Sequence, residues 1–332
     1  MNILVTGGCG FMGSHFIRHI LATYPQYSIV NLDALTYCGN PENLKDIQGH
    51  PQYLFVKGDI TDGSLVNALV SDGIDVIVNY AAETHVDRSI LDPKAFITTD
   101  VLGTHTLLEA AKRYGVHKYI QISTDEVFGT ISSGSFTEHS PFQPNSPYAA
   151  SKAGGDLLAR AYFKTYGVPV IGTHASNCFG PNQYPEKFIP LFITNLLEEK
   201  KVPLYGDGQQ VREWLYVTDH ARAIDHVLHH GGIGERYVIG SGEERSNKEV
   251  VDILLSTLDK SEDMVQYVVD RPGHDRRYSV DSSKLRTLGW MPEYTFAEGM
   301  GKTIQWYQEH QEWWRPLKSG EFRDYYQKQY VK

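Results

Sequence analysis

Side chains that can move protons are concentrated between residues 123 and 152 of the sequence. Asp125 and Glu126 are adjacent carboxylates, and Tyr148 and Lys152 stand four residues apart. A Tyr and a Lys at this spacing lie on one face of a helix, where the ammonium, helped by a cationic cofactor, lowers the phenol pKa from about 10 towards neutrality. Repulsion between the carboxylates raises the pKa of one of them, which suits an acid beside a base. Two bases and an acid indicate a redox step coupled to an elimination.

Alternating strand and helix patterns supply the elements that would position these groups. Asp125 and Glu126 follow one of the strands, and successive residues on a strand point to opposite faces. They share a site only if the chain leaves the strand before them; otherwise they belong to a charged loop. Strands that alternate with helices at this spacing predict an α/β fold with a doubly wound, parallel, Rossmann-type sheet. We expect strands at residues 3–6, 28–32, 53–56, 74–80, 119–122 and 168–173, and helices ending near Ala22, at 93–114 and from Tyr148 onwards.

A glycine-rich turn between the first strand and the first helix indicates a dinucleotide site, rather than a plain tight turn. Gly7, Gly10 and Gly13 would let the backbone approach a pyrophosphate at the helix N-terminus. Asp33 ends the second strand and is placed to accept hydrogen bonds from the adenosine ribose. No Arg follows it to hold a 2′-phosphate, which favours NAD over NADP. Asp59, after the third strand, is placed to bond the adenine amino group.

The alternation of strands and helices fails beyond Asn177. We expect an NAD-binding Rossmann domain at residues 1–177, to which the chain returns at about residues 215–240. Residues 178–214 and 241–332 would form a smaller C-terminal α/β domain that binds the substrate.

Composition and charge narrow the functional classes. The chain is 41% hydrophobic and 21% charged, and its net charge of −9 argues against nucleic acid or an anionic membrane as the main partner. That charge is compatible with a local basic pocket for a phosphorylated ligand. The chain has three cysteines, Cys9, Cys38 and Cys178. Because this number is odd and they are far apart in the sequence, we expect reduced thiols in a cytoplasmic protein. We expect no export signal, no membrane span and no metal site.

Several motifs carry a resemblance to a known family. They are the glycine turn, Tyr148-x-x-x-Lys152, and residues 40–44 (Asn-Pro-Glu-Asn-Leu), 123–129 (Ser-Thr-Asp-Glu-Val-Phe-Gly), 184–187 (Tyr-Pro-Glu-Lys), 206–208 (Gly-Asp-Gly) and 271–275 (Arg-Pro-Gly-His-Asp). Along nearly its whole length the chain resembles the extended short-chain dehydrogenase/reductases. Within them it is similar to the nucleotide-sugar 4,6-dehydratases, most of all those that act on dTDP-glucose. Sister epimerases tend to carry small residues in place of Asp125 and Glu126, so the acidic pair is the discriminating feature.

The resemblance implies an NAD-dependent lyase that converts dTDP-glucose to dTDP-4-keto-6-deoxyglucose for deoxysugar synthesis of the rhamnose type. Tyr148 would take the O4 proton while hydride passes from C4 to NAD. Lys152 would tune Tyr148 and bond the nicotinamide ribose, and Thr124 would position O4. Glu126 would remove the C5 proton and Asp125 would protonate the departing C6 oxygen, after which the hydride returns to C6.

The resemblance also assigns two sets of binding residues. The cofactor-binding set is Gly7, Gly10, Phe11, Met12, Gly13, Asp33, Ala34, Leu35, Thr36, Asp59, Ile60, Tyr80, Ala81, Ala82, Thr84, Thr99, Tyr148, Lys152 and Cys178. The substrate-binding set is Thr84, His85, Thr124, Asn177, Glu186, Lys187, Pro203, Leu204, Tyr205, Arg212, Asn247, Arg271 and His274. Arg276 and Arg277 are either further ligands or surface residues.

Five positions depart from the usual pattern of the family. Asp100 and Cys178 stand where Asn is common, His174 where Arg is common, Phe179 where Tyr is common, and Glu213 where Asp is common. Cys178 cannot offer the amide that an Asn would place near the nicotinamide. These changes do not affect the acid/base set. They leave open which nucleotide base the substrate carries, which sugar is preferred and whether the cofactor stays bound.

Two other functional classes are compatible with the sequence. One is a dehydratase for another nucleotide sugar, or a 4-epimerase; the other is a non-catalytic NAD-binding regulator. A binding module has no need of a poised base, so the intact proton-transfer residues count against the regulator. The resemblance further implies a homodimer through a four-helix interface, made by the helices that begin at Pro93 and at Tyr148.

Overall fold

The computed structural model describes residues 1–330. Within these residues a seven-stranded, wholly parallel sheet forms the larger part of the molecule, in the order β10-β6-β5-β4-β1-β2-β3. The prediction of an α/β fold with a doubly wound sheet is confirmed. The strands are β1 (Asn2–Thr6), β2 (Ser28–Asp33), β3 (Tyr53–Lys57), β4 (Val76–Asn79), β5 (Lys118–Thr124), β6 (Val170–Ala175) and β10 (Arg236–Ile239).

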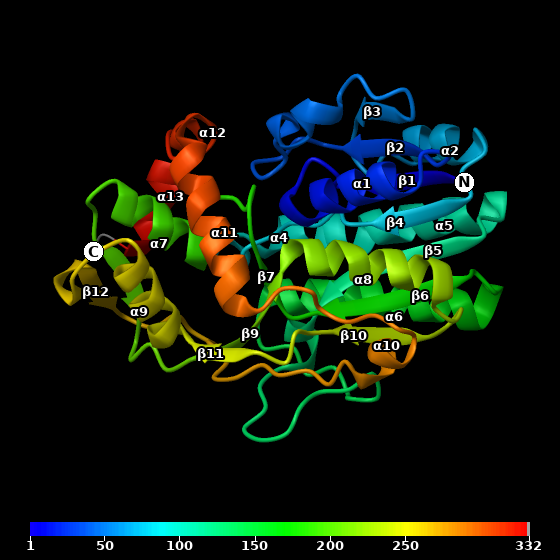
Figure 1. Cartoon of the computed structure of the whole chain (residues 1–332). Coiled ribbons are helices and arrows are strands. Elements are labelled where there is room, and N and C mark those ends of the chain that lie inside the picture. Colours follow the sequence, from blue (N-terminus) through cyan, green and yellow to red (C-terminus); the bar gives the residue numbers. More distant parts are fainter. Residues whose placement is uncertain (331–332) are drawn as a thin grey trace.

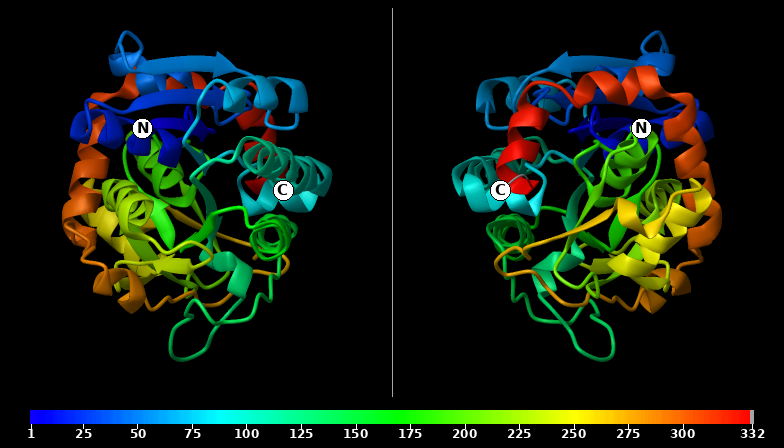
Figure 2. Two further views of the ribbon diagram at one scale, coloured as in Figure 1. Left: turned by 90° about the vertical axis from the view of Figure 1, so that its right-hand side faces the viewer. Right: turned by 90° about the vertical axis from the view of Figure 1, so that its left-hand side faces the viewer.

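Helices cover both faces of this sheet (Figures 1 and 2). Alternate strand residues face opposite layers, so Ile3 and Val5 belong to one core and Leu4 to the other. The first core includes helices α1 (Phe11–Thr23) and α8 (Val217–His230). The second includes α2 (Gly63–Ser71), α5 (Thr104–Tyr114) and α6 (Pro147–Tyr166).

The helix predicted at residues 93–114 is interrupted. It consists of α4 (Pro93–Phe96), a π-helical segment (Ile97–Gly103) and α5. The wider turn carries Asp100 and lies directly against α6, where a Cβ atom on Gly155 would be 2.7 Å from the Asp100 carbonyl oxygen. The strand predicted at residues 74–80 is also shorter than expected, and the one predicted at 168–173 lies two residues further along.

A smaller part of the molecule has a core of its own, which includes Phe192, Trp214, Leu254 and Trp314. A three-stranded sheet, β11-β9-β7, and a two-stranded sheet, β12-β8, run through it. Its elements are β7 (Asn177–Phe179), α7 (Phe188–Leu197), β8 (Val202–Tyr205), β9 (Val211–Tyr216), β11 (Glu244–Ser246), α9 (Asn247–Thr257), β12 (Val265–Val268), α11 (Phe296–Glu309), α12 (Gln311–Leu317) and α13 (Glu321–Tyr330). Between these parts the chain returns to the large sheet as α8 and β10, although the exact domain boundaries stay a prediction.

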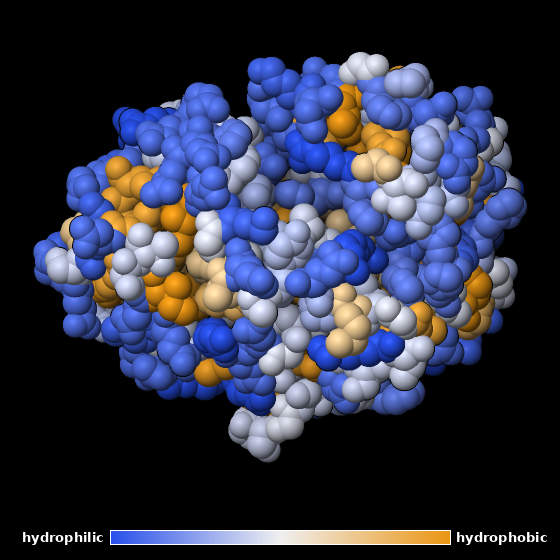
Figure 3. Space-filling view, in the orientation of Figure 1, coloured by the Kyte–Doolittle hydropathy of each residue, from blue (hydrophilic) through white to orange (hydrophobic). Residues whose placement is uncertain are grey.

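Short helices complete the fold: η1 (Pro41–Ile47), α3 (Val86–Leu91), η3 (Asp125–Phe128), η4 (Glu262–Met264) and α10 (Ser283–Thr287). The face seen in Figure 3 is largely hydrophilic, with hydrophobic residues gathered over the smaller part of the molecule. None of the helices in residues 1–330 has the length and apolar character that crossing a bilayer requires.

Candidate active site

A cavity of about 320 Å³ opens where β1, β2, β4, β5 and β6 end. In open parallel sheets this edge is where ligands bind. Every residue of the predicted cofactor-binding set lines the cavity except Leu35. Leu35 instead lies beside Asp33, to whose Oδ1 its backbone N–H donates at 2.8 Å.

The glycine turn has the close contacts that a dinucleotide cradle needs. Gly7 has a φ of +67°, and a Cβ atom there would lie 2.7 Å from the backbone of Ala81. A Cβ atom on Gly13 would lie 2.6 Å from the carbonyl oxygen of Gly7. No side chain of the described residues caps the N-terminus of α1, so its first N–H groups are available to a pyrophosphate. These residues therefore fit the phosphates of NAD.

Asp33 is held in place at the end of β2. Its carboxylate accepts hydrogen bonds from the backbone N–H groups of Cys9 and Leu35, both at 2.8 Å. Burial raises its pKa, although these two bonds oppose the rise. Each oxygen keeps a free lone pair, as a ribose hydroxyl would require.

The chain leaves the sheet at the acidic pair. Thr124 is the last residue of β5, and Asp125 begins the 3₁₀ turn η3. The backbone N–H of Glu126 donates to Thr124 Oγ1 at 3.2 Å, and that hydroxyl donates to Asp125 Oδ1 at 3.3 Å. The condition for both carboxylates to share a site is met, because both line the cofactor cavity.

The surroundings of the two carboxyl groups differ. Burial raises the pKa of Asp125 well above its ordinary value, and the charge of Glu126 adds to the rise. Burial also raises the pKa of Glu126, but the cations of Arg271, Arg212 and Lys187 oppose it. Asp125 is thus better suited to hold a proton and act as an acid. The positive charges around Glu126 favour its ionised form, which suits a base.

Tyr148 and Lys152 enter the cavity from the first turns of α6, which is capped by Ser146. The Lys152 ammonium donates to the carbonyl oxygen of Ile122 at 2.8 Å. In the protein alone the pKa of Tyr148 is raised; the predicted lowering, which includes the charge of a cationic cofactor, stays a prediction. Burial raises that pKa well above 10, and nearby carboxylates, Glu126 first, raise it further, while a hydrogen bond with Thr124 opposes them. A phenolate here therefore needs the positive charge of the oxidised cofactor.

A second cavity, of about 150 Å³, adjoins the first and shares Glu126, Asn177 and Lys187 with it. Every residue of the predicted substrate-binding set lines one of the two cavities. Arg276 and Arg277 line neither; they pair with Asp207 at 2.9 Å and Glu244 at 2.6 Å at the surface.

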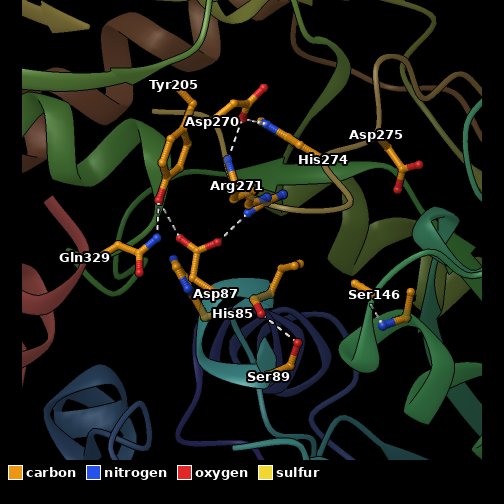
Figure 4. A network of polar contacts seen from close by, with 12 residues as sticks. His85, Asp87, Ser89, Ser146, Tyr205, Asp270, Arg271, His274, Asp275 and Gln329 are labelled. Carbon is orange, nitrogen blue, oxygen red and sulfur yellow. Dashed lines mark hydrogen bonds and ion pairs between the residues drawn. The ribbon is translucent and has the colours of Figure 1, made fainter. Parts of the chain in front are cut away.

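A polar network that the sequence did not reveal lies at this second cavity (Figure 4). Asp87 accepts hydrogen bonds from Arg271 at 2.9 Å, Tyr205 at 2.9 Å and Tyr325 at 3.1 Å. Gln329 donates to the Tyr205 hydroxyl at 2.7 Å. Tyr325 and Gln329 come from the C-terminal helix α13, whose polar, Tyr-rich sequence carries no catalytic motif. Asp87 follows β4, and ligands bind where the strands of a parallel sheet end, so its position in the sequence could have predicted that it lies at the site.

The departures from the family pattern have different surroundings. Asp100 accepts a 2.6 Å hydrogen bond from Ser151 and has its pKa raised to about 6 by burial. His174 contacts the buried Asp156 at 3.1 Å. Burial also raises the pKa of the Cys178 thiol, which lines the cofactor cavity.

Glu213 is a structural residue in this fold. Its carboxylate accepts hydrogen bonds from the backbone N–H groups of Gly242 at 2.8 Å and Val280 at 3.0 Å. Within residues 1–330, no group of three or more His, Cys, Asp or Glu side chains is arranged to hold a metal ion.

Known proteins share both the sequence and this architecture. The GDP-mannose 4,6 dehydratase family profile matches residues 4–303. The dTDP-glucose 4,6-dehydratase of Streptomyces griseus is 50% identical over 319 residues, covering 95% of this chain and 97% of that protein. The Streptomyces venezuelae dTDP-glucose 4,6-dehydratase, solved with NAD and TYD bound, has a TM-score of 0.94 and 52% identity, covering 96% of this chain and all of that one.

An epimerase shares the fold at lower identity. The UDP-glucose 4-epimerase of Thermus thermophilus, solved with NAD, has a TM-score of 0.86 and 31% identity over 93% of this chain and 100% of its own. The higher identity lies with the dehydratases. The chain belongs to the nucleotide-sugar 4,6-dehydratase family, in the branch of the dTDP-glucose 4,6-dehydratases.

Proposed function

We propose that this protein is an NAD-dependent dTDP-glucose 4,6-dehydratase, a lyase that forms dTDP-4-keto-6-deoxyglucose for deoxysugar synthesis of the rhamnose type. The observation that carries the proposal is the Asp125–Glu126 pair, which shares the first cavity with Tyr148, while Glu126 also lines the second cavity together with Arg212, Arg271 and Lys187. The first cavity fits NAD, and the second lies where a sugar diphosphate would meet it.

The reaction needs a temporary ketone. The C5 proton of glucose is not acidic and the C6 hydroxyl is a poor leaving group, but a ketone at C4 stabilises a carbanion at C5 as an enolate. When bound, NAD accepts the hydride from C4 and later returns it to C6. The side chains of the protein must therefore supply a base for O4, a base for C5 and an acid for the C6 oxygen.

Three side chains fit these tasks. Tyr148 removes the proton from O4; Thr124 and Lys152, which line the same cavity, are placed to assist it. Glu126 removes the proton from C5, because the surrounding cations favour its ionised form. Asp125 protonates the C6 oxygen; its Oδ2 is buried and has no hydrogen-bond partner among the described residues, so it is free to do so.

Two arginines suit the diphosphate of the substrate. Arg212 and Arg271 line the second cavity, and guanidinium groups match phosphate oxygens in geometry and charge. Arg271 is held by Asp87 through one nitrogen, while its buried Nε has no hydrogen-bond partner in residues 1–330. That N–H is available to a phosphate oxygen.

Product analysis tests this function directly. The enzyme with NAD is incubated with dTDP-glucose, and in parallel with UDP-glucose, and the product is identified by its alkali-induced absorbance and by NMR. We expect a 4-keto-6-deoxy sugar from dTDP-glucose. A hexose that keeps its C6 hydroxyl would identify an epimerase, and NAD binding without turnover of either sugar would leave only a binding protein.

We further propose that the active form is a homodimer. Large apolar side chains are exposed along the π-helical segment, α3 and α6, which pack against one another: Leu91 is 61% exposed, Ile97 57%, Leu102 52% and Leu157 56%. A second copy of the chain would bury them. Light scattering should give twice the chain mass, and a Leu102→Asp/Leu157→Asp variant should be monomeric. Leu54→Asp, on the exposed strand β3, is the matched control; a monomeric unaltered protein would contradict the proposal.

We also propose that the protein works in the cytoplasm. Cys9, Cys38 and Cys178 are free thiols, which a reducing compartment maintains. Fractionation of cells that express the tagged chain tests this location.

A further inference from the structure

Arg271 has the chemistry to bind the diphosphate of the substrate, but no regular backbone structure holds it. It lies in the loop between β12 and α10, and it lines the second cavity. Its guanidinium stands at the end of a long, flexible stem. If that stem were ordered only when the ligand binds, the ordering would weaken the affinity. The residue that holds Arg271 beforehand therefore contributes to substrate binding.

Asp87 holds Arg271 in the structure (Figure 4). Its Oδ1 accepts a hydrogen bond from Arg271 Nη1 at 2.9 Å, and the residue is 3% exposed. Burial by itself raises the pKa of Asp87, but neighbouring positive charge and hydrogen bonds, including those of Arg271, bring the pKa below its ordinary value. The buried Nε of Arg271 has no hydrogen-bond partner in residues 1–330. A guanidinium carries five N–H donors, so this contact orients the group and leaves donors for a phosphate.

Two tyrosine hydroxyls hold the Asp87 carboxylate in turn. Tyr205 and Tyr325 donate to its Oδ2 at 2.9 and 3.1 Å, which keeps Oδ1 turned towards Arg271. Asp87 belongs to α3, after β4 of the large sheet, whereas the tyrosines belong to β8 and α13 of the smaller part of the molecule. The carboxylate thus joins the two parts of the molecule at the second cavity.

The backbone that leads to Asp87 is strained. His85, two residues earlier, has a φ of +79°, a region that few residues other than glycine occupy. Such strain persists only where the surrounding contacts enforce it, and it gathers at functional sites. His85 Nδ1 lies 3.3 Å from the Tyr325 hydroxyl that also donates to Asp87. The same hydroxyl therefore contacts both the strained residue and the carboxylate.

We propose that Asp87 is a positioning residue that aligns Arg271 for the diphosphate of the substrate. This inference rests on the proposed function. The sign of the effect separates alignment from simple electrostatics. A carboxylate near a diphosphate repels it, so removing the charge alone would tighten binding. Losing the alignment of the guanidinium would weaken binding.

Calorimetric titration of the NAD-loaded enzyme with dTDP tests the alignment. We expect Asp87→Asn, which keeps the shape and removes the charge, to bind dTDP about tenfold more weakly, because Arg271 must then be ordered on binding. Asp207→Asn is the matched control, since Asp207 pairs with Arg276 at 2.9 Å at the surface and lines neither cavity. The control should bind dTDP as the unaltered enzyme does. Unchanged or tighter binding in Asp87→Asn would overturn the proposal.

A double-mutant cycle shows whether Asp87 acts through Arg271. In an Arg271→Met background, which already lacks the guanidinium, Asp87→Asn should weaken dTDP binding by less than about twofold. A further tenfold loss in that background would mean that Asp87 supports the fold in general, and the positioning role would fall.

Tyr325→Phe supplies a milder variant in case Asp87→Asn does not fold. It removes one donor to Asp87 at nearly constant shape, so it should weaken dTDP binding at least about twofold and leave the affinity for NAD unchanged. Equal affinity for dTDP in this variant would contradict the alignment. These titrations need no turnover. An unaltered enzyme that binds dTDP but makes no 4-keto-6-deoxy product from dTDP-glucose would refute the proposed function and not the alignment.

Discussion

Asp100 offers a quantitative test of the electrostatics around the catalytic helix. Its carboxyl group is 2% exposed, accepts a hydrogen bond from Ser151 and lies near Lys152. Burial, its largest influence, raises the pKa from 3.8 to about 6 in spite of the Lys152 charge. We predict that Asp100→Asn, which restores the usual residue of the family, stabilises the protein increasingly as pH rises.

The sign and size follow from linkage. The folded-state pKa lies above the unfolded one, so the stability that protonated Asp100 contributes is complete below about pH 4 and is lost as pH rises through 6. A difference of about 2 pKa units corresponds to about 3 kcal/mol, most of it developing between about pH 4 and 7. The variant lacks this loss, so its advantage in free energy of unfolding should grow by about 2 to 3 kcal/mol over that range.

Urea unfolding at several pH values measures this difference. Asp72→Asn, which removes an exposed carboxylate, is the control and should show a nearly constant difference from the unaltered protein. If the difference in free energy of unfolding between Asp100→Asn and the unaltered protein did not change with pH, the argument that burial raises the pKa of Asp100 would be refuted. The same variant should shift the rising limb of the kcat/KM profile to lower pH, because the Asp100 charge raises the pKa of Tyr148.

Three further variants separate the proposed roles. Glu126→Gln should retain C4 oxidation but slow C5 exchange with solvent deuterium, followed by NMR, by about 10²–10⁴-fold; unchanged exchange would remove Glu126 as the base. Tyr148→Phe should lose the reduced-nicotinamide absorbance that follows mixing with substrate, while calorimetry shows unchanged binding of dTDP; intact turnover would mean that the oxidation step is assigned wrongly. Cys178→Asn should bind NAD about 3- to 10-fold more tightly, since an added hydrogen bond is worth about 1 kcal/mol; equal affinity would show that position 178 does not contact the nicotinamide.

Short sequence patterns were sufficient to predict the large sheet and the position of the cofactor site. Each strand of the predicted sheet is a short, largely apolar run, and the glycine turn stands at the first strand–helix junction. Parallel strands bring their carboxyl ends to one edge, so residues such as Asp33 and Tyr148 converge on one cavity although they are far apart in sequence. The residues 93–114 were misjudged because their helical pattern does not show the π-helical turn against α6.

The direction in which each pKa is shifted could be derived only from the structure. Proximity of Tyr148 and Lys152 predicted a lowered phenol pKa, but the phenol is buried beside three carboxylates, and burial disfavours its charged form. Likewise, the sequence placed Asp125 beside Glu126 without showing how their surroundings differ: the cations of Arg271, Arg212 and Lys187 act on Glu126, whereas the charges of Glu126 and Glu213 add to the effect of burial on Asp125 and only Arg212 opposes it.

The sequence by itself determined the order of the elements and the glycine turn at the cofactor cavity, and it supplied the residues proposed as the acid/base set, because each depends on residues close together along the chain. The tertiary structure alone decided what surrounds those groups. Asp87, which lines the second cavity, accepts a hydrogen bond from Tyr325 of α13, 238 residues further along the chain. Distances of that kind, and the burial that shifts a pKa, arise only when distant segments pack together, and no pattern of neighbouring residues encodes them.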